Sequence, residues 1–289
     1  VERRQPAGAR ATVEPKLTWL QTRFDLDAAQ VKKVVLTFPS LLSKSVESME
    51  SNCDWLQRRL DLDAAELRKM VLRLPPLLYL SVEDNLTPTL DWLQKHLELD
   101  DAGLRKMVRQ FPALLGYSIE DNLAPKLEWL QMRLDLDGEQ LKKVVLGIPP
   151  LLGLRVDNMA PTLDWLQTRL DLDDAGLRKI VLTLPQLLGY SVEDNLEPKF
   201  KWLQTRLVLD AAQLQKVVLG HPSLLSLSVE ANMAPTLDWL QTRLGLDEAG
   251  LRKIVLRLPP LLYLSVEDNM EPKLEWLQKR LDLDGEQLR

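Results

Sequence analysis

The chain has 289 residues, of which 45% are hydrophobic and 27% charged, the composition of a globular protein and not of a disordered or fibrous one. It carries 37 Lys and Arg against 42 Asp and Glu, a net charge of -5, which excludes a uniformly basic surface. One cysteine, Cys53, excludes an intrachain disulfide, and with only His96 and His221 we predict no metal site and no cofactor. No apolar run approaches the roughly 18 residues of a membrane-spanning helix, so we expect no membrane partner.

A repeat fills the chain after an N-terminal tail, residues 1–11. Its tryptophans lie 36 or 37 residues apart, at positions 19, 55, 92, 129, 165, 202, 239 and 276. A proline follows seven of them by 20 residues, at positions 39, 75, 112, 149, 185, 222 and 259. Because this distance is constant, the length differences lie between each proline and the next tryptophan, where we expect a loop. Residues 12–289 are predicted to form one continuous array of seven units and a truncated eighth.

The first helix of each unit is expected to begin seven residues before its tryptophan. Good N-cap residues occupy this position in every unit: Thr12, Ser48, Asn85, Asn122, Asn158, Asn195, Asn232 and Asn269. Proline follows three residues later in seven of the eight units, which suits the first turn of a helix. Leu123, Leu127, Leu130 and Leu134 then have the spacing of an amphipathic helix of about three turns.

A second helix is expected to begin at an aspartate eight residues after each tryptophan, as at Asp137. Five of these aspartates are followed after three residues by Gln or Glu, the pattern of a reciprocal capping box. Pro149 should end this helix, and the Pro-x-Leu-Leu that begins with it should form a short helical turn with buried leucines. Since two such helices cannot bury their apolar faces alone, the sequence predicts an all-α fold, an α-solenoid of stacked 36–37-residue units.

Two basic rows on the second helix are candidates for binding phosphates. The Lys row lies fourteen residues after tryptophan and consists of Lys33, Lys69, Lys106, Lys143, Lys179, Lys216 and Lys253. The neighbour row immediately precedes it and consists of Lys32, Arg68, Arg105, Lys142, Arg178 and Arg252. Equivalent side chains on stacked units would form a ladder suited to a nucleic-acid backbone. The alternative is an ordinary solvated helix face, where cations are favoured near the C-terminal end.

A third row, the Arg row, lies four residues after tryptophan. Its members are Arg23, Arg59, Arg133, Arg169, Arg206, Arg243 and Arg280, with His96 at the equivalent position of the remaining unit. Four residues are about one helical turn, so each guanidinium could stack on its own tryptophan as a cation–π pair. The alternative is a role in nucleic-acid binding, for which Arg59, Arg133, Arg169, Arg206 and Arg243 are secondary candidates.

Nothing in the sequence indicates catalysis. It has no Gly-rich phosphate loop, no Ser-His-Asp set, no paired carboxylates and no context for a cysteine nucleophile, so we expect neither an enzyme nor a small-molecule substrate.

The unit across residues 118–152 contains Asn-Leu-x-Pro-Lys-Leu-x-Trp-Leu, Leu-Asp-Leu-Asp and Pro-x-Leu-Leu in that order. In these motifs it resembles the repeat of the mitochondrial transcription termination factor family, mTERF. The resemblance implies two α-helices and a short 3-10 turn per unit in a curved superhelix. It also implies binding of nucleic acid, duplex DNA or RNA, in transcription termination or other gene expression in a mitochondrion or chloroplast. A protein–protein interaction scaffold without nucleic-acid binding is the alternative function.

Overall fold

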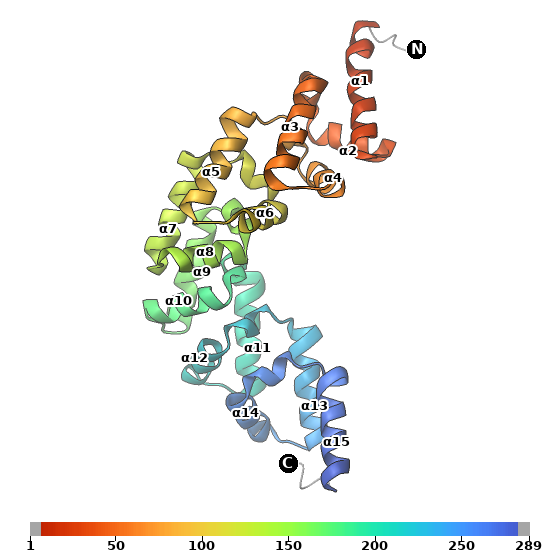
Figure 1. Ribbon diagram of the computed structural model, residues 1–289. Coiled ribbons are helices and arrows are strands. Elements are labelled where there is room, and N and C mark those ends of the chain that lie inside the picture. The colour runs from red at the N-terminus through yellow and green to blue at the C-terminus, as the bar shows by residue number, and fades with distance from the viewer. Residues whose placement is uncertain (1–6, 283–289) are drawn as a thin grey trace, which may run out of the picture. The chain divides into compact units, whose positions relative to one another are not determined.

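The computed structural model describes residues 7–282, and all the regular secondary structure in that range is helical (Figure 1). Two compact parts divide the chain, one formed by residues 1–130 and 137–153 and the other by residues 131–136 and 154–289. Both parts repeat the same unit, so the all-α repeat fold is confirmed. The single continuous array stays a prediction.

Each of the first seven units has a first α-helix that carries the tryptophan, a second α-helix and a 3-10 turn, and the described residues of the eighth contain the first helix. The first helices are α1 (Ala7–Phe24), α3 (Val46–Leu60), α5 (Thr87–His96), α7 (Ala124–Leu134), α9 (Val156–Arg169), α11 (Glu197–Leu207), α13 (Ala234–Leu244) and α15 (Glu271–Leu281). The second helices are α2 (Ala28–Thr37), α4 (Ala64–Arg73), α6 (Asp101–Gln110), α8 (Gly138–Gly147), α10 (Asp174–Thr183), α12 (Ala211–Gly220) and α14 (Glu248–Arg257). The 3-10 turns are η1 (Pro39–Ser43), η2 (Pro75–Leu78), η4 (Pro112–Gly116), η6 (Pro149–Gly153), η7 (Pro185–Gly189), η9 (Pro222–Ser226) and η11 (Pro259–Tyr263).

The predicted start and end of the second helix are confirmed in all seven units described. In α8 the Asp137 carboxylate accepts a hydrogen bond from the Gln140 backbone N–H at 2.8 Å, and the Gln140 side chain accepts one from the Asp137 N–H at 3.2 Å. Helices α2, α4 and α12 have the same capping box. The fifth expected box, at Asp284 and Gln287, lies outside the described residues. Pro149 follows the end of α8 and opens η6, whose leucines are buried.

The predicted N-caps of the first helices are wrong. Thr12, Ser48 and Asn158 lie inside α1, α3 and α9, and the five asparagines of the other units lie inside π-helical turns. In six units the cap is a serine three or four residues upstream, and its hydroxyl oxygen accepts a hydrogen bond from a backbone N–H three residues on, whereas the cap of α9 is Arg155, which makes no such side-chain bond. These serines are Ser45, Ser81, Ser118, Ser191, Ser228 and Ser265. The sequence pattern does not mark these serines as caps, because the residues that follow them have the composition of a connecting loop.

The π turns account for the two unit lengths. They are η3 (Val82–Leu86), η5 (Ile119–Leu123), η8 (Val192–Leu196), η10 (Val229–Met233) and η12 (Val266–Met270). Each lies between a proline and the next tryptophan where these two residues are separated by the longer interval. In η8 the Ser191 carbonyl accepts from the N–H of Leu196, five residues on, at 3.1 Å. In the shorter units α3 and α9 run without a π turn. The extra residue is therefore absorbed as a π turn, as single insertions into α-helices often are, and not in the expected loop.

The core of each unit is aliphatic, but the position three residues before tryptophan is polar. Lys126 and Lys199 are only 5% and 7% exposed, and burial lowers the pKa of both side chains. Each ammonium donates to a carbonyl in the 3-10 turn of its own unit, Lys126 to Leu152 and Lys199 to Leu225. These hydrogen bonds tie the first helix of a unit to its 3-10 turn.

Candidate nucleic-acid interface

The Lys row is exposed along the second helices. All seven side chains are exposed, and within the described residues none makes a hydrogen bond or ion pair with another side chain or with a backbone carbonyl. The preceding turn of the same helix has a small alanine four residues before the lysine in six units, as Ala175 before Lys179; the exception is Glu139 before Lys143. The ammonium groups are therefore available to a ligand in solution.

The neighbour row makes different contacts, although it is adjacent in sequence. Its side chains reach back to the C-terminal end of the first helix of the preceding unit. Arg68 Nε donates to Phe24 O at 2.8 Å, and Arg178 Nε donates to Leu134 O at 2.9 Å. Lys142 Nζ donates to Glu98 O at 3.0 Å, and Arg252 Nη1 donates to Val208 O at 3.2 Å. Arg105 Nη1 forms an ion pair with Asp61 Oδ2 at 3.1 Å. Lys32 has no such partner among the described residues. The neighbour row thus holds consecutive units together.

Electrostatics explains why cations occupy the neighbour row. A residue one or two positions after each first helix is left-handed, with φ near +50°, and it is usually an aspartate, as at Asp135 and Asp171. The carbonyl groups at a helix C-terminus carry a partial negative charge, and the aspartate adds a full one. Arg178 neutralises both at the end of α7 in the preceding unit, because it donates to the Leu134 carbonyl and pairs with Asp135 at 2.7 Å.

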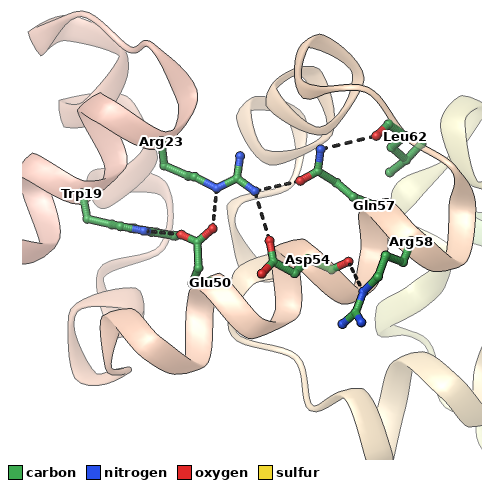
Figure 2. A network of polar contacts seen from close by, with 7 residues as sticks. All are labelled: Trp19, Arg23, Glu50, Asp54, Gln57, Arg58 and Leu62. Carbon is green, nitrogen blue, oxygen red and sulfur yellow. Dashed lines mark hydrogen bonds and ion pairs between the residues drawn. The ribbon is translucent and has the colours of Figure 1, made fainter.

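The Arg row also joins consecutive units, and Figure 2 shows one such contact. Arg23 donates from Nε to Glu50 and from Nη2 to Gln57 Oε1, both at 2.7 Å. The Trp19 indole N–H donates to the other oxygen of Glu50 at 2.6 Å. Gln57 in turn donates to Leu62 O at 3.3 Å. These hydrogen bonds thus connect the side chains of α1 to α3, and through α3 to the loop between α3 and α4.

The secondary candidates repeat this geometry. Each donates to the glutamine two residues after the next tryptophan, and several also pair with an acid nearby. The pairs are Arg59 with Gln94, Arg133 with Gln167, Arg169 with Gln204, Arg206 with Gln241 and Arg243 with Gln278. The side chains with an ion pair are about a quarter exposed. These guanidiniums already have protein partners.

The expected stacking of arginine on its own tryptophan is wrong for the residues that the structure describes. Arg23 and Arg169 instead approach the rings of Phe24 and Phe200, because their charged ends are drawn to acceptors in the next unit. His96, which replaces arginine, does stack on Trp92, with ring centroids 4.6 Å apart and planes at 11°. The missed partner was the glutamine two residues after tryptophan, which is present in all eight units. That recurrence was the available signal.

Helices repeated in units of two α-helices and a 3-10 turn define an α-helical repeat protein of the solenoid class. Comparison with known families matches the mTERF family over residues 7–100, 56–173 and 166–288. The chain belongs to the mTERF family. No curated protein matches the chain. Membership suggests a nucleic-acid-binding repeat protein in a family that is generally non-enzymatic and typically organellar.

A search of the described residues for a membrane-spanning segment finds no helix of sufficient length and apolarity.

Proposed function

We propose that the chain binds double-stranded nucleic acid, DNA or RNA, through the Lys row. The observation that carries this proposal is that the three basic rows differ in their contacts within the protein. Every Arg-row side chain except Arg280, at the end of the described residues, contacts another unit, and so does every neighbour-row side chain except Lys32. The Lys row, in contrast, has no partner among the described residues. A cation with no protein partner gives up no contact within the protein when it binds a phosphate.

Family membership supports the setting of this activity. The proposed role is transcription termination or another step of gene regulation in a mitochondrion or chloroplast, as the family is typically organellar. Sequence preference would then come from groups other than the Lys row, since contacts to phosphates position a protein and contacts to bases specify the sequence.

A titration with labelled duplex DNA and duplex RNA at two salt concentrations tests the proposal. Each phosphate that the protein no longer neutralises should reduce the slope of log affinity against log salt by about 0.9 for DNA. Replacing Lys179, Lys216 and Lys253 by alanine should therefore weaken binding and flatten the salt dependence. The matched control replaces three exposed lysines of the first helices, Lys95, Lys201 and Lys279. Absence of binding at low salt, or an equal effect of the control, would refute the proposal.

The charge balance favours one second candidate. Acids outnumber bases by 42 to 37, and exposed acids such as Glu193 and Asp194 recur where the chain enters each first helix. A protein–protein scaffold that takes a basic partner would use this acidic edge. In the same titration, no duplex binding at low salt would favour the scaffold over the phosphate ladder.

A further inference from the structure

A cleft of about 380 Å³ lies between the N-terminal part of α9 and the segment that follows the second helix of the same unit. Its lining residues come from α9, η7 and η8 and from the residues that connect them, and they include Asn158, Thr162, Leu188 and Glu193. All of them belong to one of the two compact parts of the chain. The volume falls in the range of small-molecule sites, about 300–1,000 Å³, so the cleft is large enough for a small organic ligand.

Other units of this chain place an ammonium group at the position equivalent to this cleft. Thr162 stands three residues before its tryptophan, where two other units have Lys126 and Lys199. The Lys126 ammonium donates to the carbonyl of Leu152, 26 residues on, and to Asn122 Oδ1 at 3.0 Å. Lys199 makes the same two bonds in its own unit. A carbonyl of the 3-10 turn and an asparagine thus form an ammonium site twice in this chain.

In the unit of α9 the two equivalent acceptors have no donor. The carbonyl is that of Leu188 and the side chain is that of Asn158, and both residues line the cleft. Thr162 is too short to donate to them as lysine does, and its hydroxyl contacts instead the backbone carbonyls of Tyr190, at 3.2 Å, and of Asn158, at 3.5 Å. Within residues 7–282 no hydrogen bond reaches the Leu188 carbonyl or the Asn158 side chain.

The other units with threonine at this position use their asparagine differently. Asn85 Oδ1 accepts from the Ser81 backbone N–H at 3.1 Å, and Asn232 Oδ1 accepts from the Ser228 backbone N–H at 3.0 Å. The unit of α9 has no such serine, because it is one of the shorter units and its cap is Arg155. In the described part of the chain, this unit alone combines the threonine with an asparagine whose side chain has no protein partner.

The charge around the cleft favours a cation. Asp157 and Glu193 line it and are both exposed. Asp157 pairs with the exposed Arg155 at 3.2 Å, whereas Glu193 has no ion-pair partner among the described residues. Two apolar side chains, Leu154 and Val192, also line the cleft and are partly exposed. A ligand that suits this surface carries an ammonium group on a short alkyl chain.

We propose that this cleft binds a small primary amine in its ammonium form. The ammonium donates to the Leu188 carbonyl and to Asn158 Oδ1, and the alkyl chain lies against Leu154 and Val192. The bound ligand thus supplies the group that Lys126 supplies in its own unit. Neither the Lys row nor nucleic acid takes part, so this proposal and the proposed function can fail independently.

Nuclear magnetic resonance of the ¹⁵N-labelled chain, titrated with butylammonium chloride at constant ionic strength, provides the test. Butylammonium is the lysine side chain without its backbone. We expect saturable shifts of the Gly189 backbone amide and of the Asn158 side-chain amide. Tetramethylammonium has the charge without an N–H donor, butanol has the chain without the charge, and potassium is an inorganic cation. The absence of a saturable shift, or an equal response to any of these three controls, would overturn the proposal.

Two variants locate the site. Thr162→Lys copies the arrangement of Lys126, so its own ammonium should occupy the cleft and abolish the response of Gly189 to butylammonium. The matched control, Thr89→Lys, makes the same change in a unit whose asparagine already has a partner, and it should leave that response unchanged. Asn158→Ala, at an exposed position, should keep the fold and weaken binding by about ten-fold, as the loss of one hydrogen bond to a charged group does. Undiminished binding in Thr162→Lys or in Asn158→Ala would overturn the proposal.

Discussion

Arg206 donates from Nη2 to Oε1 of Gln241 at 2.8 Å, across 35 residues of sequence and from one repeat unit to the next. The same nitrogen donates to Asp238 at 2.8 Å. Equivalent bonds recur between other consecutive first helices. The stability of the array therefore depends on a glutamine that the sequence marks only by its distance from tryptophan.

Replacing Arg206 by alanine should destabilise the protein by about 1–2 kcal/mol, since it removes two charge-assisted hydrogen bonds at a partly buried site. Urea unfolding followed by circular dichroism measures the change. Arg155→Ala is the matched control, because Arg155 and its partner Asp157 are 79% and 78% exposed and a pair of that kind contributes less than about 1 kcal/mol. Equal losses for the two variants would show that the bond to Gln241 contributes nothing beyond a surface ion pair.

Val208→Gly should stabilise the protein. Val208 has φ 50° and ψ 50°, a left-handed conformation that costs a residue with a side chain about 1–2 kcal/mol and costs glycine nothing. The side chain is 52% exposed, so little burial is lost, and the gain should be about 1 kcal/mol in the free energy of unfolding. Gly245 holds the same position in the next unit with φ 59°. Gly245→Val should therefore destabilise by a similar amount, and a neutral result for both variants would contradict the argument.

Local signals in the sequence predicted the local parts of the fold. Asp137 and Gln140 are three residues apart, and Pro149 acts on its own helix, so capping and termination could be predicted without tertiary structure. The partner of Arg23 could not, because Gln57 is brought to it by the packing of α1 on α3. The stacking of Arg on Trp was expected because both lie on one helix, but the acceptors of the next unit satisfy the guanidinium better.

The candidate site shows the same limit. The Lys row and the neighbour row were grouped because Lys179 follows Arg178 directly in the sequence. Adjacent residues on a helix point about 100° apart, and only the structure shows that Arg178 faces the end of α7 while Lys179 faces solvent. The sequence therefore predicted the basic helix but not which of its cations are free.

The stability contributed by Lys126 should depend on pH. Burial lowers its pKa below the ordinary 10.5, so between the lowered value and 10.5 the unfolded chain binds more protons than the folded chain. The contribution of Lys126 to stability should therefore rise with pH in that window, against the opposite trend of Cys53, whose pKa burial raises to about 12. Lys126→Thr, which copies the residue at Thr162, should remove this contribution and leave that of Lys199, whose pKa burial also lowers, whereas Lys95→Thr on an exposed site should retain both. Urea unfolding at neutral pH and at pH values approaching 10.5 measures the difference, and identical pH profiles for wild type and Lys126→Thr would refute the prediction.

Deleting Glu193 should convert a longer unit into a shorter one without loss of fold. Glu193 is an exposed residue of η8, and without it the Leu196 N–H would stand four residues after Ser191 and make an ordinary α-helical bond to the Ser191 carbonyl. The shorter unit with α9 already has such a start, where the Met159 N–H donates to the Arg155 carbonyl at 3.3 Å. Stability should change by less than about 1 kcal/mol, within the range of surface changes and small backbone adjustments.

Deleting Lys201 is the control. Lys201 is also exposed, but it follows the π turn inside α11. Its loss would therefore rotate the preceding turns of the helix by about 100° relative to Leu203 and expose Phe200. Thermal unfolding of the two deletion variants separates these outcomes, and a severe loss for the Glu193 deletion would show that the π turn is needed in its own right.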